Sequence, residues 1–251
     1  MPNPSGTAIR LLITAGPTRE YIDPVRFISN PSTGAIGYAL ATAAATRGHR
    51  VVLVSGPTHL SPPAGVRFVA VESAVQMQRQ VNRFFPWAQA VIAAAAVGDY
   101  RPRRPARTKI KKENTRLRLD LMRNPDILEG LGQRKGAKIL IGFALESANM
   151  RANARAKLEK KNLDLIVANR CSRRQSPFGS GRTSAVIIGR HAETYCAAVS
   201  KMRLAGIILD RMERLCYSLP ASVPIRAAGA RGTKKQSRQY TADKALKRPH
   251  S

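Results

Sequence analysis

Short apolar runs alternate along this chain with longer segments of helical character. The runs are five or six residues long and rich in Val, Ile, Leu and Ala, which predicts buried strands. They lie at 9–14, 50–54, 66–71, 90–95, 138–143 and 164–168. Helices are predicted between and after them, at 34–47, at 73–85, from Asn124 onward, at 149–161 and at 200–215. Two further runs, 184–188 and 193–197, predict a β-hairpin.

Residues that commonly begin and end helices support these spans. Gly48 follows the first predicted helix and is typical of a C-terminal stop. Ser73 and Gln76 have the spacing of a capping box at the start of the second. Asn124, followed by Pro and Asp, predicts an N-cap for the third.

The alternation of strands with helices defines the expected fold class. It predicts an α/β, Rossmann-like, three-layer αβα domain with a mainly parallel sheet, to which a flap and a small β-hairpin arm are added. Such sheets bind ligands beyond the carboxyl ends of their strands. We therefore expect the functional residues in the loops that follow the strands.

The loop 16–37 after the first strand carries the strongest local signal. It is long, polar and glycine-containing, and it leads into an alanine-rich helix. Free backbone N–H groups and the helix dipole favour an anion at such a helix start. Arg19 and Arg26 add groups that bind phosphate or carboxylate. The loop thus predicts a site for a phosphorylated or carboxylated small molecule.

Two segments interrupt the regular pattern. Residues 99–120 are rich in Arg, Lys and Pro and include Lys-Ile-Lys-Lys at 109–112, which predicts a mobile flap. The segment after residue 220 has no periodic apolar pattern and is predicted to be disordered. We expect a domain over 1–220 and a basic tail over 221–251.

The chain of 251 residues carries a formal net charge of +28, and this charge is unevenly distributed. Residues 1–100 contribute +4, residues 101–220 contribute +17 and residues 221–251 contribute +7. Such a charge is typical of a basic protein that binds nucleic acid or another polyanion, and this binding is the alternative function. Aromatic residues make up only 5% of the chain and do not form a basic–aromatic stacking surface, so nucleic acid is not the favoured partner.

Cysteine usage indicates a protein of a reducing compartment. Three cysteines without Cys-x-x-Cys spacing form neither a disulfide framework nor a zinc ribbon. The four histidines are scattered, so structural or exposed positions are expected for them. The N-terminus lacks a signal pattern and no apolar run is long enough for a membrane span. We expect a cytoplasmic protein with no membrane association.

Familiar nucleotide motifs are absent from the sequence. There is no phosphate loop ending in Gly-Lys-Ser/Thr, and no Gly-x-Gly-x-x-Gly fingerprint follows the first strand. Within residues 1–220 no Tyr-x-x-x-Lys pair is present to donate a proton in a dehydrogenase. A nicotinamide oxidoreductase is therefore disfavoured.

A series of motifs in a fixed order resembles the phosphopantothenate–cysteine ligase family of coenzyme A biosynthesis. The resemblance covers roughly residues 8–217. Its motifs are Asp23-Pro24-Val25-Arg26-Phe27-Ile28-Ser29-Asn30, Ala94-Ala95-Ala96-Val97-x-Asp99-Tyr100, Lys109-Ile110-Lys111-Lys112, Asn124-Pro125-Asp126-Ile127, Gly142-Phe143-Ala144-x-Glu146 and Lys157-x-x-x-Lys161-Asn162-Leu163-Asp164.

The resemblance implies a two-step ligase reaction of the bacterial, CTP-dependent type. The carboxylate of 4'-phosphopantothenate is activated as an acyl-cytidylate, and the cysteine amine then attacks it. Mg²⁺ is expected with the triphosphate.

The family also implies a homodimer, in which the hairpin region near 170–197 helps to cover the neighbouring subunit, and no flavin in this chain. A phosphopantothenoylcysteine decarboxylase is expected to be a separate polypeptide, because the chain starts at the ligase. The choice between CTP and ATP is left open by the residues themselves.

The same resemblance implies roles for individual residues. Asn30 and Lys109 are expected to be catalytic, with the Asn30 amide donating to a carbonyl oxygen and Lys109 covering the acyl-cytidylate. The implied nucleotide-binding residues are Asp99, Lys109, Met122, Arg123, Asn124, Pro125, Phe143, Lys157 and Lys161. The implied substrate- and phosphate-binding residues are Arg26, Asn30, Ser32, Thr33 and Gly34, and no metal ligand is assigned.

Four positions depart from the family pattern. Ala35 stands where bacterial relatives often carry Lys, Arg170 where Asp is usual, and Gly181 and Thr183 where Asp and Asn are common. We expect these departures to affect local details and the dimer arm while sparing the main site.

Overall fold

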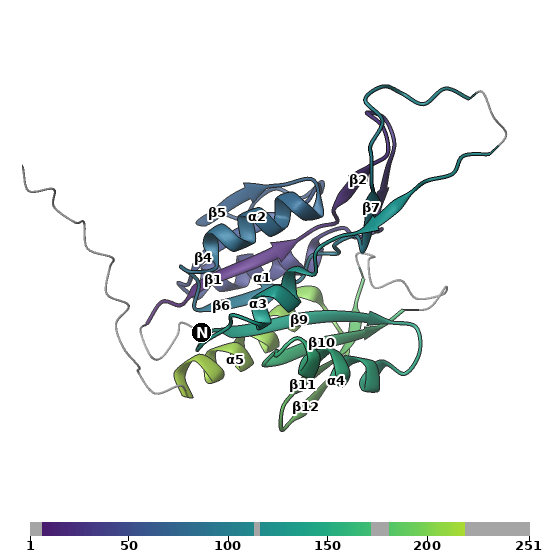
Figure 1. The fold of residues 1–251 in the computed structure, drawn as a ribbon. Coiled ribbons are helices and arrows are strands. Elements are labelled where there is room, and N and C mark those ends of the chain that lie inside the picture. Colours follow the sequence, from purple (N-terminus) through teal and green to yellow (C-terminus); the bar gives the residue numbers. More distant parts are fainter. Residues whose placement is uncertain (1–6, 113–115, 172–180, 219–251) are drawn as a thin grey trace, which may run out of the picture. The chain divides into compact units, whose positions relative to one another are not determined.

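The computed structural model describes residues 7–112, 116–171 and 181–218. Its centre is an eight-stranded sheet with the order β12-β11-β10-β9-β6-β1-β4-β5 (Figure 1). The six strands from β10 to β5 are parallel, and β11 and β12 add an antiparallel hairpin at one edge. The strands are β1 Arg10–Ala15, β4 Arg50–Ser55, β5 Val66–Ala70, β6 Ala90–Ala93, β9 Ile139–Glu146, β10 Leu165–Arg170, β11 Thr183–Gly189 and β12 Glu193–Val199.

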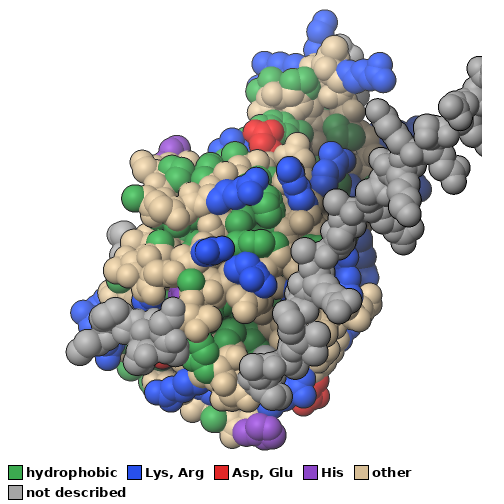
Figure 2. All heavy atoms as spheres, turned by 90° about the vertical axis from the view of Figure 1, so that its left-hand side faces the viewer, with side chains coloured by type: hydrophobic (Ala, Val, Ile, Leu, Met, Phe, Trp, Pro, Cys, Tyr) green, Lys and Arg blue, Asp and Glu red, His purple; other side chains and the backbone are tan. Residues whose placement is uncertain are grey.

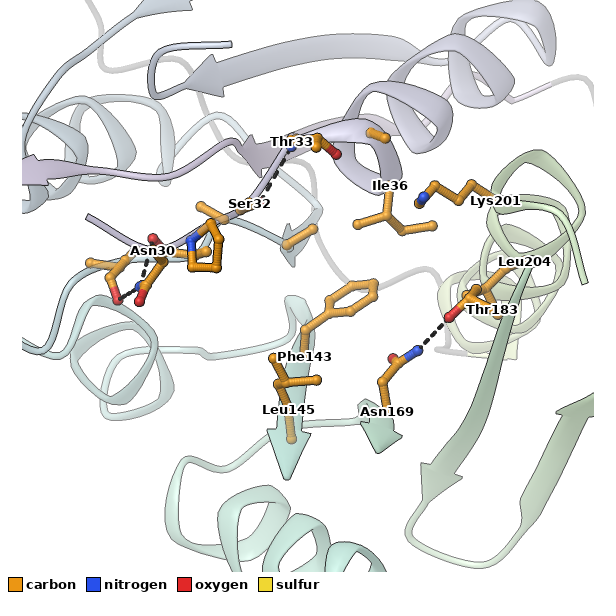
Figure 3. Close-up of a pocket in the computed structure, with 18 of the residues that line it drawn as sticks. Asn30, Ser32, Thr33, Ile36, Phe143, Leu145, Asn169, Thr183, Lys201 and Leu204 are labelled. Carbon is orange, nitrogen blue, oxygen red and sulfur yellow. Dashed lines mark hydrogen bonds between the residues drawn. The ribbon is translucent and has the colours of Figure 1, made fainter. Parts of the chain in front are cut away.

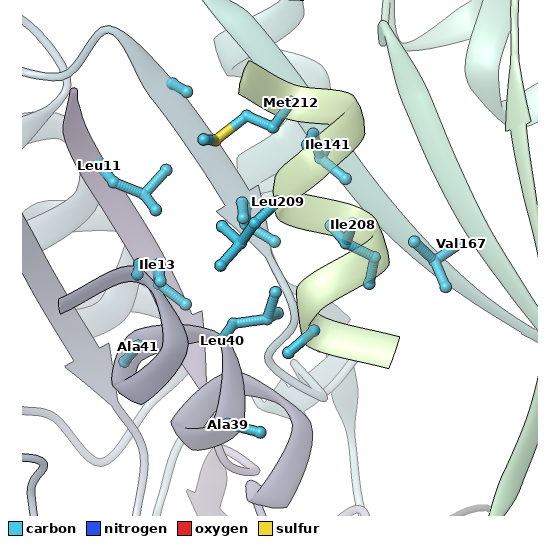
Figure 4. Close-up of a cluster of buried hydrophobic side chains, with 14 of the residues drawn as sticks. Leu11, Ile13, Ala39, Leu40, Ala41, Ile141, Val167, Ile208, Leu209 and Met212 are labelled. Atoms are coloured by element: carbon cyan, nitrogen blue, oxygen red, sulfur yellow. The ribbon is translucent and has the colours of Figure 1, made fainter. Parts of the chain in front are cut away.

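Helices cover both faces of the sheet and create two apolar cores. The helices are α1 Ala35–Thr46, α2 Ala74–Phe84, α3 Ile127–Gly132, α4 Met150–Lys160 and α5 Lys201–Ser218. Leu11 and Ile13 of β1 pack in the core under α1 and α5, whereas Leu12 packs in the core under α2, α3 and α4 (Figure 4). Because successive side chains of a strand point to opposite faces, a sheet covered on both sides needs apolar residues at every position, as β1 has.

A polar clasp fastens the end of α1 to α5. The His49 ring has no exposed surface, and its Nδ1 accepts the backbone N–H of Ile9 at 3.3 Å. The Nε2 atom therefore carries the hydrogen and donates to Glu213 Oε1 at 2.8 Å. Arg47 binds the same carboxylate at 3.0 Å and Asp210 at 2.8 Å. The prediction of a structural histidine is confirmed at this position.

Two small ladders lie beside the main sheet and support the flap. β2 Arg19–Tyr21 pairs with β3 Phe27–Ser29, and β7 Tyr100–Pro102 pairs with β8 Leu121–Arg123. β7 and β8 join the two ends of the predicted flap, and β2 lies next to β7 (Figure 1). The sequence did not predict these strands, because three-residue ladders carry too little apolar alternation to be recognised.

The α/β, Rossmann-like fold is confirmed, including all six predicted parallel strands and the hairpin. The third helix is corrected, because its N-cap is Asp126, which accepts the backbone N–H of Glu129 at 3.0 Å. The side chain of Asn124 is instead bonded to the loop after β6. The predicted tail, 221–251, lies outside the described residues. No helix in the described ranges is long and apolar enough to cross a membrane.

Candidate functional site

The loops after β1 and β4 pack tightly at the carboxyl edge of the sheet. Gly34 is the N-cap of α1 and has a φ of 77°, a left-handed conformation that favours glycine. A Cβ at Gly34 would lie 2.7 Å from Cγ2 of Thr58. A Cβ at Gly56 would lie 1.7 Å from the carbonyl oxygen of Pro17. The repeated Gly-Pro-Thr sequences at 16–18 and 56–58 thus belong to two loops in contact, which position the start of α1.

A cavity of about 520 Å³ opens in front of this helix start, and we call it the turn cavity (Figure 3). Ser32 Oγ accepts the backbone N–H of Gly34 at 3.3 Å, which holds the turn in place. In Figure 3 the side chain of Lys201 extends from the start of α5 toward Ile36. The lining consists of residues 30–36 and 94–97, Asp99, residues 143–145, Asn169, Thr183, Lys201 and Leu204.

Asn30 lies on the rim of the turn cavity with its amide already engaged. Its Nδ2 donates to the carbonyl oxygens of Ala96 and Val97, both at 3.2 Å. Two carbonyl neighbours fix the orientation of the amide, because only the nitrogen can donate to them. The amide oxygen is therefore the group that Asn30 offers to a ligand. This differs from the expectation that the Asn30 amide donates to a substrate carbonyl.

A second cavity, of about 570 Å³, lies on the other side of the sheet edge, and we call it the lysine cavity. It shares Ala95, Val97, Asp99 and Phe143 with the turn cavity. The sheet edge at Phe143 is thus a common wall. The remaining lining comprises Thr14, Met77, Val81, Val91, Ala93, Gly98, Tyr100, residues 123–129, Leu131, Lys157, Lys160 and Lys161.

Each of the two predicted nucleotide-binding lysines of α4 is paired with a carboxylate. Lys157 Nζ lies 2.6 Å from Oε1 of Glu146, and Lys161 Nζ lies 2.7 Å from Oδ2 of Asp126. Burial opposes the ionisation of Glu146 and Asp126, but hydrogen bonds from these lysines, their positive charge and further hydrogen bonds from Asn153 and the Glu129 backbone together outweigh it and lower the pKa of both carboxyl groups. The lysines are therefore held in place as charged groups at the cavity wall.

Asn124 fixes the loop that separates the two cavities. Its Nδ2 donates to the carbonyl oxygen of Gly98 at 2.8 Å, and its Oδ1 accepts Arg101 at 2.8 Å. Its backbone N–H also donates to the carbonyl oxygen of Asp99 at 2.8 Å. The segment that carries Asp99 is thus tied to the end of β8, which carries Arg123.

The structure brings most of the predicted site residues together, with three exceptions. Asn30, Ser32, Thr33 and Gly34 line the turn cavity, and Arg123, Asn124, Pro125, Lys157 and Lys161 line the lysine cavity. Asp99 and Phe143 line both. Arg26, Lys109 and Met122 line neither. Arg26 is instead bonded to Asp23 and to the carbonyl oxygen of Ile110 in the flap.

Three polar lining residues of the turn cavity, Asn169, Thr183 and Lys201, were not assigned to the site from the sequence. Asn169 donates to Thr183 Oγ1 at 2.9 Å, and Lys201 lies at the start of α5. They come from the last third of the chain, where no recognised motif indicated a ligand. Thr183 and Ala35, two of the departures, also line this cavity, so these two lie at the candidate site itself.

Basic side chains are not confined to the cavities. Figure 2 shows Lys and Arg side chains scattered among apolar and polar ones over one face, with few acidic side chains between them. Among residues 7–112, 116–171 and 181–218, no group of three or more His, Cys, Asp or Glu side chains is arranged to hold a metal ion. A divalent cation at this site would need phosphate oxygens as its main ligands.

Two cavities meet at the carboxyl ends of the strands of an α/β sheet, one in front of a helix start and one walled by lysines, and both features favour anionic ligands. The chain belongs to the family described as the DNA/pantothenate metabolism flavoprotein C-terminal domain, whose model matches residues 7–215.

Relatives of known structure and sequence support this membership. The chain is 47% identical over 171 residues to the coenzyme A biosynthesis bifunctional protein CoaBC of Bacillus subtilis, covering 68% of this chain and 42% of that protein. The solved C-terminal domain of a CoaBC protein is 38% identical with a TM-score of 0.71, covering 83% of this chain and 96% of that one. A Cab2 mutant in complex with phosphopantothenate-cysteine is 16% identical with a TM-score of 0.69, covering 83% and 88%, which shows the fold alone. The chain spans about half the length of the curated relatives it matches.

Proposed function

We propose that this chain is a phosphopantothenate–cysteine ligase that uses CTP. The observation that supports this proposal most strongly is the pair of cavities that meet at Phe143 and Asp99. Two anionic substrates need separate binding sites with adjacent reacting ends, and cationic groups must offset their repulsion. The match to CoaBC proteins and the ligand of the Cab2 complex agree with this substrate class.

The proposed reaction has two balanced steps. A carboxylate oxygen of 4'-phosphopantothenate bonds to the α-phosphorus of CTP, and pyrophosphate leaves. The cysteine amine then bonds to the acyl carbon, loses a proton, and CMP leaves. Binding both substrates against one wall supplies the proximity that each step requires.

The residues of the two cavities are assigned complementary roles in this proposal. The helix start at Ser32, Thr33 and Gly34 binds the acidic ligand of the turn cavity, with Asn30 as a polar contact at its rim. Lys157 and Lys161 bind the nucleotide phosphates, and Lys109 of the flap covers the intermediate. Arg123, Asn124, Pro125, Asp99 and Phe143 complete the nucleotide wall. Arg26, Lys109 and Met122 line neither cavity, so the proposed role of Lys109 depends on the flap reaching over the ligands, and no ligand contact is assigned to Arg26 or Met122.

Mg²⁺ is proposed to enter with the triphosphate and to neutralise part of its charge. The acidic side chains that line the lysine cavity are Asp99, Asp126 and Glu129. Asp126 is bonded to Lys161 and caps α3. Asp99, on the common wall, is therefore the carboxylate best suited to approach a triphosphate-bound cation.

The protein is further proposed to act as a homodimer through the flap and its neighbours. Large apolar side chains are exposed on β3, β7 and β8 and beside them, including Val25 at 58% and Phe27 at 41%. Such a group of exposed apolar side chains is typical of a protein–protein interface. Analytical ultracentrifugation is expected to give a dimer mass at micromolar concentration, and a monomer throughout would contradict this. A separate decarboxylase, the absence of flavin and a cytoplasmic location remain predictions.

Pyrophosphate release tests the proposed activity. The protein with Mg²⁺, CTP and 4'-phosphopantothenate is expected to release pyrophosphate, and added cysteine is expected to yield the amide product by mass spectrometry. ATP in place of CTP tests the nucleotide preference. No release from folded protein with either nucleotide would overturn the proposal.

Two substitutions test the catalytic assignments. Lys109→Gln is expected to lower kcat strongly without changing the melting temperature, because Lys109 is exposed on the flap. Lys112→Gln, which removes the same charge from an exposed position nearby, is the matched control. Asn30→Asp is expected to slow turnover, because a carboxylate cannot donate to the carbonyl oxygens of Ala96 and Val97 and adds a charge beside an acidic ligand. Normal kinetics in either variant would remove that residue from the mechanism.

A further inference from the structure

Asp23, in the turn between β2 and β3, is a buried carboxylate with a full set of hydrogen bonds. Its side chain has no exposed surface. Oδ1 accepts the backbone N–H groups of Val25 at 2.8 Å and Arg26 at 2.9 Å. Oδ2 accepts the Arg26 guanidinium at 2.9 Å and the backbone N–H of Ile110 at 3.1 Å. Four donors occupy the acceptor sites that an ionised carboxylate has.

These bonds divide into a local set and a distant one. The bonds to Val25 and Arg26 form the turn itself and need only an acceptor oxygen at residue 23. The bond to Ile110 reaches 87 residues along the chain, into the flap. A neutral Asn or Ser serves a turn of this kind, so the buried charge is explained by the ion pair with Arg26 and not by the turn.

The same flap residue is held from its other side. The Arg26 guanidinium donates to the carbonyl oxygen of Ile110 at 3.2 and 3.3 Å. Both backbone polar groups of Ile110 are therefore bonded to the Asp23–Arg26 ion pair. A further backbone bond joins Ala106 to Ile22 at 2.8 Å. The flap is thus fastened to the β2–β3 turn immediately next to Lys109.

We infer that Asp23 is a positioning residue that docks the flap and so sets the location of Lys109. Asp23 lines neither cavity, so it acts through the flap and not on a ligand. Arg26 contributes to the same attachment, because its guanidinium binds the carbonyl oxygen of Ile110. The inference rests on the proposed catalytic role of Lys109, and it assigns a task to the Asp-Pro-Val-Arg motif that ligand binding leaves unexplained.

Asp23→Asn removes the bonds that hold the flap and keeps the bonds that form the turn. The amide oxygen retains the bonds to the Val25 and Arg26 backbone, while the amide nitrogen cannot accept the Ile110 N–H or pair with Arg26. We expect kcat to fall about 10- to 100-fold, as for loss of a hydrogen bond to a charged group. The KM for the nucleotide is expected to change less than about threefold, because the lysine cavity is unaltered. The control is Asp120→Asn, which removes a flap carboxylate that is 73% exposed and 3.8 Å from Arg103.

A double substitution distinguishes positioning from a structural role. If Asp23 acts through Lys109, Asp23→Asn combined with Lys109→Gln is expected to be no slower than Lys109→Gln alone. Independent, multiplicative losses would overturn the inference, and so would an unchanged kcat in Asp23→Asn.

Limited trypsin digestion measures how firmly the flap is attached to the β2–β3 turn, and it does not require catalytic activity. Cleavage after Arg107 and Lys109 is expected to be faster in Asp23→Asn than in the wild-type protein or in Asp120→Asn. Equal cleavage rates would overturn the inference. If the wild-type protein releases no pyrophosphate, the proposed function fails, whereas the digestion still decides whether Asp23 holds the flap.

Discussion

The turn cavity and the lysine cavity share a wall but are built in different ways. The turn cavity is shaped by backbone, since a left-handed glycine and two packed loops set the start of α1. The lysine cavity is shaped by side chains, since Lys157, Lys161 and the α3 cap Asp126 line it, each held in an ion pair. Backbone changes are therefore expected to affect the first cavity, and changes of charge, salt or pH the second.

Removing one lysine should give the largest effect and should be confined to the nucleotide. Lys161→Gln deletes a charge from the lysine cavity and leaves Asp126 without its partner at 2.7 Å. We expect kcat/KM for the nucleotide to fall about 100-fold, the range for a lost bond to a phosphate, with phosphopantothenate binding changed little. The control is Arg151→Gln on the same helix, which pairs with Glu193 and lines neither cavity. Equal losses for both ligands would remove the distinction between the cavities.

A backbone change should give an intermediate effect on the opposite cavity. Gly34→Ala forces an alanine to a φ of 77° and places its Cβ 2.7 Å from Thr58 Cγ2. We expect about 1–2 kcal/mol of lost stability and a raised KM for phosphopantothenate, with nucleotide binding nearly unchanged. Thermal unfolding measures the loss of stability, and ligand titration measures the change in phosphopantothenate and nucleotide binding.

Adding Thr58→Ser to Gly34→Ala separates collision from strain. The serine removes Cγ2 but leaves the left-handed backbone. Partial recovery of stability is therefore expected, because the strain of the positive φ remains. Full recovery would show that the conformation of residue 34 contributes nothing.

The smallest expected effect concerns acid stability. Interaction with Lys157 and Asn153 outweighs burial and holds the pKa of Glu146 below its ordinary value of 4.5. The folded state therefore gains stability from Glu146 above pH 4.5 and loses it as the pH falls through the lowered pKa. Because Lys157 is partly exposed, the gain is about 0.5–1 kcal/mol. Urea unfolding of Glu146→Gln should differ from the wild-type protein at pH 7 and converge with it as the pH falls below the lowered pKa of Glu146, and a constant difference would contradict this.

The sequence predicted the parts of the molecule that local patterns determine. The six parallel strands, the hairpin and the turn at 30–34 follow from apolar runs, glycines and polar residues. The cap of α3 was misassigned to Asn124, because two acceptors lie close together and only tertiary contacts decide which of them binds the helix. The Asn124 amide is used by Gly98 and Arg101, which leaves Asp126 as the cap.

Contacts between distant segments explain what the sequence did not reveal. Arg26 was assigned to phosphate, but its guanidinium lies between Asp23 and Ile110. Thr183 and Lys201 line the turn cavity from positions about 150 residues beyond the turn, and no local spacing indicates such an approach. A resemblance transfers roles to motif positions, and it cannot say which side chains fill the space between motifs.

The last described helix, α5, can complete the site only after all the strands of the sheet have been synthesised. α5 contributes Lys201 and Leu204 to the turn cavity, Leu209 and Met212 to the core, and Glu213 to the clasp with His49. A chain still emerging from the ribosome can pair its first strands and bury one face of the sheet while the other face awaits this helix. The turn cavity gains this wall only after residues 201–218 have been synthesised, so a truncated product lacking them would expose an unfinished core and leave the cavity open.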